Sequence, residues 1–483
     1  MKNLRDILYK TGMLEVIGQT DLAVGGVVSD SKQVKPGDVF VAIKGMQTDG
    51  HRFIPQAIQA GARAVVCEEM PGNRPEGVTF VRVKDTRSGA GIMAANFYDH
   101  PSEKLKLVGI TGTNGKTSTA TLLYDLFSAM GHPCGLLSTI RIMIAGKAFD
   151  TTHTTPDPIR LNQVLHNMVQ AGCDHVFMEV SSHAVVQKRI EGVKFAGGVF
   201  TNITHDHLDY HASFRDYLQA KKSFFDGLGK EAFALINKDD KNGPVMLQNT
   251  KARAVTYGLT SAADYQGRLM ESTFSGMHMQ IDRSDLWTKL VGRFNALNLL
   301  AVYATARLLG AEKEEVLRRL SLCSAPEGRF DHFTANNHIT VIIDYAHTPD
   351  ALDNVLRTIG EIRTRQETLY TVVGCGGNRD KAKRPLMAAI AASHSDKVIL
   401  TSDNPRMEDP DTIIEDMKTG LDILARKKTL SITNRKEAIH AACQLAKTGD
   451  IILIAGKGHE KVQEIQGVRH TFDDKQIAME ALQ

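Results

Sequence analysis

The sequence lacks several features that would assign it to other classes of protein. Its six cysteines have no paired spacing, which argues against a zinc ribbon and indicates reduced thiols rather than a disulfide framework. Lysine and arginine form no long block, and the formal net charge is only +3. The composition therefore gives no support to a nucleic-acid-binding or membrane-surface role.

Long apolar runs are also absent. No segment approaches the roughly 20 apolar residues that a membrane-spanning helix needs, and there is no repeat or low-complexity tract. The first residues, MKNLRDILYKTG, mix charged and apolar side chains, so we expect no signal peptide. With 483 residues, 42% of them hydrophobic, the chain can fill a large core. We expect a cytoplasmic monomer of about three domains.

Residues 105–131 form the strongest local motif. An apolar run predicts a buried strand, the segment Gly112-Thr113-Asn114-Gly115-Lys116-Thr117 follows, and an amphipathic stretch predicts a helix that Gly131 ends. Glycines let backbone N–H groups face an anion, and the helix N-terminus adds partial positive charge. The Lys116 amine can reach the outer phosphates of a nucleotide, and the Thr117 hydroxyl can ligate Mg²⁺.

The match to the strict P-loop pattern is incomplete, because Ile110 stands where that pattern has glycine. All the physical ingredients of a phosphate-binding loop are nevertheless present. We therefore predict a nucleotide site, against the alternative of a tight turn that needs glycine only for its geometry.

Two later predicted strands end in polar clusters. The strand at 175–180 ends in Glu179, and the strand at 198–203 leads into the segment THDHLDYH at 204–211. A carboxylate and a His/Asp cluster at neighbouring strand ends suit a Mg²⁺–nucleotide site. The segment 204–211 has two other interpretations. It could be a zinc site, although it lacks cysteine and a standard zinc spacing, or a polar surface loop.

The predicted fold class is α/β with three domains, at 1–102, 103–329 and 330–483. The first is a small domain with strands near 39–43, 62–69 and 77–83, and the second is a P-loop-type ATPase domain with a parallel sheet. In the third, strands at 340–344, 369–373, 397–401 and 451–455 alternate with helices near 350–363, 384–393, 411–426 and 436–447. This alternation predicts a Rossmann-like, doubly wound parallel sheet.

Each strand of the third domain ends in a polar or glycine-rich loop, at 344–347, 374–380, 403–406 and 456–460. In open α/β sheets the ligand crevice lies at these ends. Arg379 and Arg406 can bind carboxylates through two parallel hydrogen bonds, so we expect a second, anionic ligand there. The alternative for each arginine is a surface ion pair, for Arg406 with Glu408 or Asp409.

Taken together, the motifs resemble those of the Mur ligases, ATP-dependent amide-forming enzymes that build the peptidoglycan stem peptide. The resemblance spans nearly the whole chain and rests on a series of motifs in the family's order: GITGTNGKTS (109–118), HTTPD (153–157), MEVSSHAVVQKR (178–189), THDHLDYH (204–211), YLQAKKSFF (217–225), RFNALN (293–298), PEGRFD (326–331), DYAHTPDAL (344–352), GCGGNRDKAKRP (374–385), DNPR (403–406) and AGKGHE (455–460).

The resemblance implies a ligase that adds the third residue to UDP-N-acetylmuramoyl-L-alanyl-D-glutamate. DNPR is similar to the tetrapeptide of members that add meso-diaminopimelate rather than L-lysine. The implied reaction transfers the γ-phosphoryl group of ATP to the γ-carboxylate of D-glutamate, and the incoming amine then attacks the acyl phosphate. The group that deprotonates this amine is left open, with His347 as one candidate.

The resemblance also implies site residues, which fall into four groups by ligand. ATP would be bound by Gly112, Thr113, Asn114, Gly115, Lys116, Thr117, Ser118, Asn295, Arg329 and Asp344. Mg²⁺ would be held by Thr117, Glu179, His207 and a carbamylated Lys221. The UDP-substrate would be bound by Ser29, Ser31, Met46, Gln47, Thr48, Thr154, Thr155, Ser181, Gln187 and Arg189. Diaminopimelate would be bound by Arg379, Asp403, Asn404, Pro405, Arg406, Gly456 and Glu460.

Lys116, Glu179, His207 and Lys221 would be the catalytic residues. Two positions depart from the expected pattern: His153 stands where the family has Asn, and Lys222 directly follows Lys221, which leaves the choice of modified lysine open. The rival interpretations are an L-lysine-adding homologue, a ligase like folylpolyglutamate synthetase, and a P-loop switch or motor without ligase activity.

Overall fold

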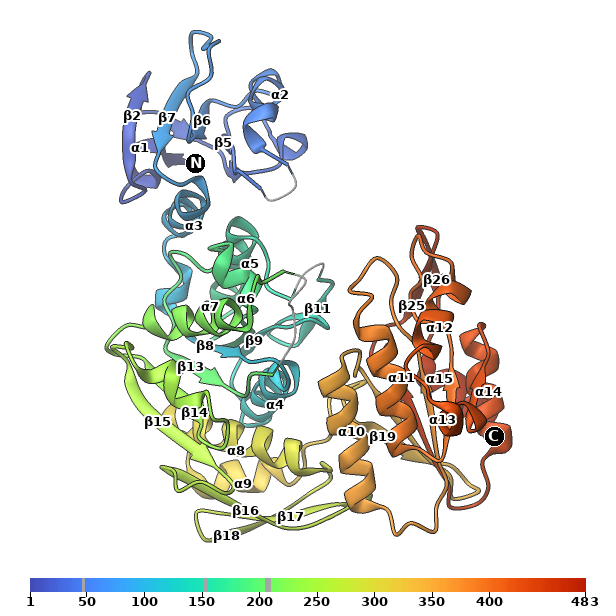
Figure 1. Cartoon of the computed structure of the whole chain (residues 1–483). Helices are drawn as coiled ribbons and strands as arrows, with labels where there is room; N and C mark the ends of the chain where they lie inside the picture. Colours follow the sequence, from blue (N-terminus) through green and yellow to red (C-terminus); the bar gives the residue numbers. More distant parts are fainter. Residues whose placement is uncertain (46–47, 152–153, 205–209) are drawn as a thin grey trace.

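The computed structural model describes residues 1–45, 48–151, 154–204 and 210–483, which fold into three successive α/β domains (Figure 1). Each domain is built on its own sheet, formed by strands within residues 13–83, 106–288 and 331–455. The predicted fold class is thereby confirmed, whereas the boundary residues remain predictions. Among the described residues, no helix is long and apolar enough to cross a bilayer.

The N-terminal domain is a five-stranded sheet with strand order β2-β7-β6-β5-β4, in which only β2 runs antiparallel to its neighbour. The predicted strands are present, with somewhat shorter bounds. The elements, with η for a 3₁₀ helix, are β1 (Lys2–Asn3), α1 (Leu4–Ile7), β2 (Met13–Ile17), β3 (Ala23–Val24), β4 (Val27–Val28), η1 (Ser31–Gln33), β5 (Val39–Val41), η2 (Gly50–Phe53), α2 (Ile54–Gln59), β6 (Ala64–Cys67), β7 (Thr79–Val83) and α3 (Thr86–Phe97).

The central sheet has eleven strands in the order β11-β10-β9-β12-β8-β13-β14-β15-β16-β17-β18. The elements of this domain are η3 (Pro101–Lys104), β8 (Lys106–Thr111), α4 (Lys116–Ala129), β9 (Cys134–Leu137), β10 (Ile142–Ile144), β11 (Lys147–Phe149), α5 (Pro158–Gln170), β12 (His175–Glu179), α6 (Ser182–Val186), β13 (Gly197–Phe200), α7 (Phe214–Asp226), β14 (Phe233–Asn237), η4 (Gly243–Leu247), β15 (Arg253–Gly258), β16 (Tyr265–Thr273), β17 (Gly276–Ile281), β18 (Ser284–Thr288), α8 (Arg293–Leu308) and α9 (Lys313–Leu320).

The middle of this sheet, from β9 to β16, is parallel as predicted, but both ends are antiparallel additions that the sequence analysis did not foresee. Strand β8 is buried on both faces. Val108 and Ile110 pack into the core shared with α4 and α8, and Leu107 packs into the core shared with α5 and α7. Strand β13 ends at Phe200 rather than at 203, because its neighbour β8 ends at Thr111 and offers no further partner.

The C-terminal sheet has the order β19-β20-β24-β21-β22-β23 and is parallel except for β19, which lies antiparallel at one edge. The elements are β19 (Asp331–Thr334), β20 (Thr340–Asp344), α10 (Pro349–Ile362), β21 (Leu369–Val373), α11 (Lys383–His394), β22 (Lys397–Leu400), α12 (Pro410–Lys418), α13 (Ile423–Lys427), β23 (Thr429–Ser431), α14 (Arg435–Leu445), β24 (Ile451–Ala455), β25 (Val462–Ile465), β26 (Val468–Thr471) and α15 (Asp474–Ala481).

One predicted helix of this domain was wrong. The stretch 411–426 is two helices, α12 and α13, because the chain turns at Gly420 and Asp422 caps a new helix by accepting from the Ala425 N–H at 2.7 Å. A Cβ at position 420 would lie 2.1 Å from the Pro385 carbonyl oxygen, so this close approach requires glycine. The hairpin β25–β26, which was not predicted, is joined to the loop before α12 by a bridge between Ile465 and Arg406.

Candidate active site

The phosphate loop between β8 and α4 has a backbone that only glycine accommodates at two positions. Gly112 and Gly115 have φ values of +156° and +85°. A Cβ at Gly112 would lie 1.9 Å from the Thr201 hydroxyl oxygen, and one at Gly115 would lie 2.5 Å from the Asn298 side-chain oxygen. The two glycines therefore allow Thr201, directly after β13, and Asn298 of α8 to pack against the loop.

The predicted phosphate-binding groups gather at the first turn of α4. The Lys116 amine donates to the carbonyl oxygens of Gly112 and Thr113 at 2.9 and 2.8 Å, which holds it over the loop. The Thr117 hydroxyl is buried and accepts from the Arg329 guanidinium at 3.2 Å. This local geometry fits an anion at the helix N-terminus.

The Glu179 carboxylate lies at the end of β12, beside the strand that leads into the loop. It is fully buried, and both of its oxygens accept from Thr139, from the backbone N–H at 2.7 Å and from the hydroxyl at 3.3 Å. Thr139, which the sequence analysis missed, lies in the turn after β9, and its distance along the chain from Glu179 left no local signal. These two hydrogen bonds fix the orientation of the Glu179 carboxylate.

Two consecutive lysines on α7 point to different partners. The Lys221 amine donates to the Gly112 carbonyl oxygen at 2.8 Å and lies 4.5 Å from the centre of the Tyr217 ring. The Lys222 amine instead lies 2.7 and 2.8 Å from the two carboxylate oxygens of Asp226. Of the two, Lys221 reaches the phosphate loop.

Four residues predicted to bind the muramoyl-peptide end are joined by direct contacts, one of which is donated by the Ser181 backbone N–H to the Thr155 hydroxyl at 3.4 Å. The Arg189 guanidinium donates to the Thr155 carbonyl oxygen at 2.7 Å and to the Gln187 side-chain oxygen at 3.0 and 2.7 Å. The Thr155 hydroxyl donates to the backbone oxygen of Glu179 at 2.9 Å, and the Ser181 hydroxyl caps α6. The Thr154 and Thr139 hydroxyl oxygens lie 3.1 Å apart, within hydrogen-bond distance. Burial lowers the pKa of Arg189.

The residues predicted for the uridine end belong to the N-terminal domain. Ser29 is partly exposed, the buried Ser31 hydroxyl donates to Gln56 at 2.9 Å, and Thr48 is exposed. Met46, Gln47, His153 and the predicted metal ligand His207 lie outside the described residues.

Lys188 connects the N-terminal and central domains, and its role was not predicted. Its amine donates to the Asp85 carboxylate at 2.7 Å and to the Ser88 hydroxyl at 2.8 Å, at the start of α3. Hydrogen bonding to Lys188 helps to hold the pKa of Asp85 below its usual range, against the opposing effect of burial. Since Lys188 lies between Gln187 and Arg189, it ties the N-terminal domain to the predicted peptide-binding cluster.

Asp350 of the C-terminal domain contacts the phosphate loop, and Arg329, from the link before that domain, contacts the first turn of α4. The Asp350 carboxylate, at the start of α10, accepts from the Asn114 amide at 2.9 Å and from the Thr204 hydroxyl at 2.8 Å. Arg329, in the link between the domains, stacks over the Tyr345 ring at 4.5 Å while it contacts Thr117.

The other two residues predicted to contact ATP, Asp344 and Asn295, form hydrogen bonds with the protein's own backbone. Asp344 accepts from the N–H groups of Phe330 and Ala346 at 2.6 and 2.8 Å, and burial raises its pKa to about 6 although Arg329 acts in the opposite direction. The Asn295 side chain donates to the Val291 carbonyl oxygen at 2.9 Å.

The rim of the C-terminal sheet brings the predicted diaminopimelate residues together from three loops. Arg406 donates to the Gly377 carbonyl oxygen at 2.8 Å, and its Nε lies 3.7 Å from the Glu464 carboxylate. It adopts a left-handed backbone with φ of +52°. The alternative pairings are not seen, since Glu408 pairs with Arg384 at 2.9 Å and Asp409 caps α12.

The remaining rim residues lie against one another. Pro405 is buried, and a Cβ at Gly377 would meet its carbonyl oxygen at 1.9 Å. A Cβ at Gly456 would lie 2.6 Å from the Asp403 carboxylate, and the Asn404 amide donates to Glu460 at 2.8 Å. Arg379 is exposed on the neighbouring loop.

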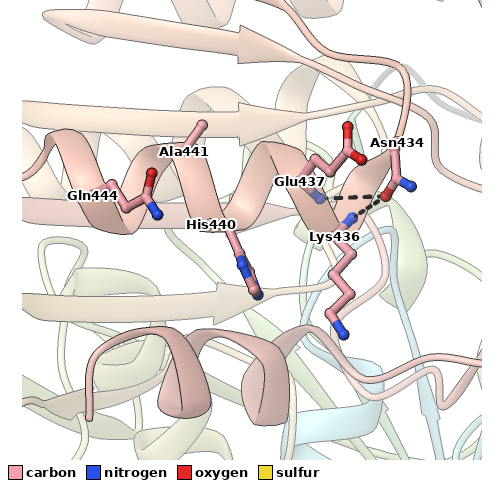
Figure 2. A pocket seen from close by; sticks show the side chains of 6 residues that line it. All are labelled: Asn434, Lys436, Glu437, His440, Ala441 and Gln444. Atoms are coloured by element: carbon pink, nitrogen blue, oxygen red, sulfur yellow. Dashed lines mark hydrogen bonds between the residues drawn. The ribbon is translucent and has the colours of Figure 1, made fainter.

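A shallow hollow of about 450 Å³ runs along α14, as Figure 2 shows. Its lining comes from that helix and its cap alone: Asn434, Lys436, Glu437, His440, Ala441 and Gln444. None of these residues belongs to the motifs described above, so the hollow is separate from the candidate site.

Comparisons with known proteins agree with this geometry. Residues 23–98 match the Mur ligase family, catalytic domain; residues 110–306 match the Mur ligase middle domain; and residues 328–458 match the Mur ligase, glutamate ligase domain. The three matches follow one another along the chain, in the N-terminal, central and C-terminal domains.

Two curated relatives are named UDP-N-acetylmuramoyl-L-alanyl-D-glutamate--2,6-diaminopimelate ligase. The protein from Cytophaga hutchinsonii is 56% identical over 480 residues, which cover 99% of each chain, and that from Bacteroides fragilis is 53% identical over 99% of this chain and 98% of its own. A solved structure of a ligase with the same name has 32% identity and a TM-score of 0.72, covering 100% of this chain and 98% of its own. The chain therefore belongs to the Mur ligase family.

Proposed function

We propose that this chain is the ATP-dependent ligase that joins meso-diaminopimelate to the γ-carboxylate of D-glutamate in UDP-N-acetylmuramoyl-L-alanyl-D-glutamate. The observation that carries the proposal is the full-length similarity to relatives named for this activity. This reaction would be one step of peptidoglycan precursor synthesis in the cytoplasm. The six free cysteines, five of them buried, suit a reducing compartment.

The phosphate loop supports the ATP half of the reaction. A carboxylate is a poor acyl donor, and transfer of the γ-phosphoryl group to it gives an acyl phosphate. This transfer needs positioning and neutralisation of charge more than a covalent protein nucleophile. Lys116, held over the loop by two carbonyl oxygens, and Arg329, bonded to Thr117, are the fixed cations available for it.

The groups around the loop suit Mg²⁺, which prefers oxygen ligands and keeps several waters. We propose that Thr117 and Glu179 hold one ion and that Glu179, His207 and a carbamylated Lys221 serve a second. When bound, Mg²⁺ would neutralise charge on the phosphate oxygens. A plain Lys221 ammonium would repel a dication at short range, whereas a carbamate is an anion with oxygen ligands. The contact of Lys221 with the Gly112 carbonyl supports this choice over Lys222.

The UDP-substrate would lie across the N-terminal and central domains. Ser29, Ser31, Met46, Gln47 and Thr48 would bind the uridine end. The cluster of Thr154, Thr155, Ser181, Gln187 and Arg189 would bind the muramoyl-peptide end, and the Thr155–Glu179 hydrogen bond would set this cluster directly beside the metal-binding carboxylate.

The rim of the C-terminal sheet would hold diaminopimelate. The amine of diaminopimelate attacks the carbonyl carbon of the acyl phosphate. The tetrahedral intermediate then collapses, and inorganic phosphate leaves as the amide forms. Closure of the three domains would exclude water from the acyl phosphate. Arg379 and Arg406 supply cations for the substrate carboxylates, and Asp403 and Glu460 supply acceptors for an ammonium group.

The test is product detection by mass spectrometry. The enzyme is given ATP, Mg²⁺, the UDP-muramoyl dipeptide and equal amounts of meso-diaminopimelate and L-lysine in one tube. We expect the diaminopimelate product almost alone. A lysine product would favour the lysine-adding alternative, and ATP hydrolysis without need for the UDP-substrate would favour a switch or motor.

A further inference from the structure

Lys457 is a fully buried lysine that the reaction described above does not use. It follows Gly456 on the loop after β24 and is 0% exposed. Its amine donates to the Asn404 side-chain oxygen at 3.0 Å and to the Glu460 carboxylate at 3.1 Å. A buried ammonium is costly unless it is paired and hydrogen-bonded, so both contacts keep the amine in this position.

Lys457, Glu464 and Glu460 together determine which way the Asn404 amide faces. Two groups that can only donate, the Lys457 amine and the Glu464 backbone N–H, both point at one side-chain atom of Asn404, at 3.0 and 2.9 Å. That atom must therefore be the oxygen. The other terminal atom faces the Glu460 carboxylate at 2.8 Å, which only accepts, and must be the nitrogen.

This orientation uses up the acceptor capacity of Asn404. A carbonyl oxygen has two lone pairs, and both have donors in the structure. One N–H of the amide is taken by Glu460, and among the residues that the structure describes the second N–H has no acceptor, so a ligand can accept from it. Asn404 can thus donate to a carboxylate but has no lone pair left for an ammonium, and the acceptors at this rim are Asp403 and Glu460.

We propose that Lys457 is a positioning residue for amino-acid selection: it helps to hold Asn404 as a hydrogen-bond donor that, with Arg406, binds the distal carboxylate of the incoming amino acid. The inference rests on the proposed function. It gives Asn404, which the sequence analysis expects only to bind diaminopimelate, a specific role as a donor to a carboxylate. Lys457 itself touches no substrate and acts through Asn404 and Glu460.

The experiment compares three amino acids as substrates, or as competing inhibitors where turnover is slow. They are meso-diaminopimelate, 2-aminoheptanedioate, which keeps the distal carboxylate but lacks the distal ammonium, and L-lysine, which keeps the ammonium but lacks the carboxylate. In Lys457→Met we expect the apparent KM to rise about tenfold or more for the two dicarboxylates, while that of lysine changes less than about twofold. The KM values for ATP and the UDP-substrate should be unchanged.

Two further variants complete the test. Asn404→Ala loses the donor without adding a negative charge beside Glu460, so it should show the same selective loss even if Lys457→Met fails to fold. Lys461→Met removes a nearby lysine whose partners are Glu327 and Asp473, and all three KM values should stay as in the wild type.

An equal loss for all three amino acids, or no loss, would overturn the positioning role of Lys457. Failure of the wild-type enzyme to use diaminopimelate would instead overturn the proposed function, so the two failures are distinguishable.

Discussion

The phosphate loop and the rim of the C-terminal sheet are built in different ways. The loop is a continuous segment. Its geometry follows from Gly112 and Gly115 and from Lys116, the first residue of helix α4. The rim is assembled from three loops and a hairpin through buried charged side chains such as Lys457 and Arg384. A site like the phosphate loop can be identified from the spacing of its residues in the sequence. A site like the rim depends on contacts between residues far apart in the chain.

The largest expected effect tests the local site. Replacing Lys116 by alanine should lower turnover by about a thousandfold or more, because a fixed cation at transferring phosphates contributes on this scale. The measurement is steady-state amide formation by the folded variant. Lys230→Ala, which removes a side chain that is 84% exposed, is the matched control and should turn over normally. Near-normal activity of Lys116→Ala would contradict the role of the loop.

The adjacent lysines of α7 sharpen the comparison within one helix. Lys221→Ala should lose about a hundredfold or more in turnover, as expected for a group that supports a metal. Lys222→Ala should keep its activity but melt at a lower temperature, because it removes the ion pair with Asp226. Mass spectrometry of the intact peptide at neutral pH, under conditions that preserve carbamates, should find the modification on Lys221. Modification of Lys222 would reverse the assignment.

At the rim, Arg406 should determine the choice between diaminopimelate and lysine. Without the distal carboxylate, the guanidinium would keep only its contacts to the Gly377 carbonyl and Glu464, at a cost of about 3 kcal/mol or roughly a hundredfold in discrimination. Arg406→Ala should therefore raise the KM for diaminopimelate and lose most of the preference in a competition assay. Arg384→Lys, at a buried site that contacts Glu408 instead of the substrate, separates loop stability from recognition. A wild-type preference in Arg406→Ala would exclude this role.

The smallest effect concerns the pH dependence of the rim. Burial, with nearby cations such as Arg329, lowers the pKa of His459 to about 3. The unfolded chain binds a proton at His459 below about pH 6.5 while the folded chain does not, so stability is lost as the pH falls. From pH 6.5 to 5 this loss is about 2 kcal/mol.

His459→Phe, which keeps a ring beside Tyr345, should not lose this part of the stability. The measurement is denaturant unfolding of both proteins across this pH range. Parallel pH profiles for the wild type and the variant would contradict the effect of burial on His459.

Much of the fold could be predicted from the sequence. The strands Thr340–Asp344, Leu369–Val373 and Ile451–Ala455 have the predicted bounds, because continuous apolar runs between turns are typical of parallel strands buried on both faces. The antiparallel strands at the sheet ends and the hairpin β25–β26 were not predicted. Their half-exposed residues give weaker patterns, and the pairing partners are set by the assembled sheet.

The candidate site shows the same division. The residues of the phosphate loop, its lysine and the DNPR segment could be named from motifs, although their ligand roles remain predictions. Thr139, Lys188, Asp350 and Lys457 were missed, because each acts through a hydrogen bond to a residue distant in the chain. Thr139 lies outside every motif, and Lys188, Asp350 and Lys457 lie inside motifs that assign no role to them.

The most direct test of the central claim, an amide ligase that acts through an acyl phosphate, follows one oxygen atom. The γ-carboxylate of D-glutamate in the UDP-substrate is labelled with oxygen-18, and the products of a diaminopimelate turnover are analysed by mass spectrometry. We predict that each inorganic phosphate released carries one labelled oxygen from the carboxylate. Unlabelled phosphate, or label found in AMP, would contradict the account.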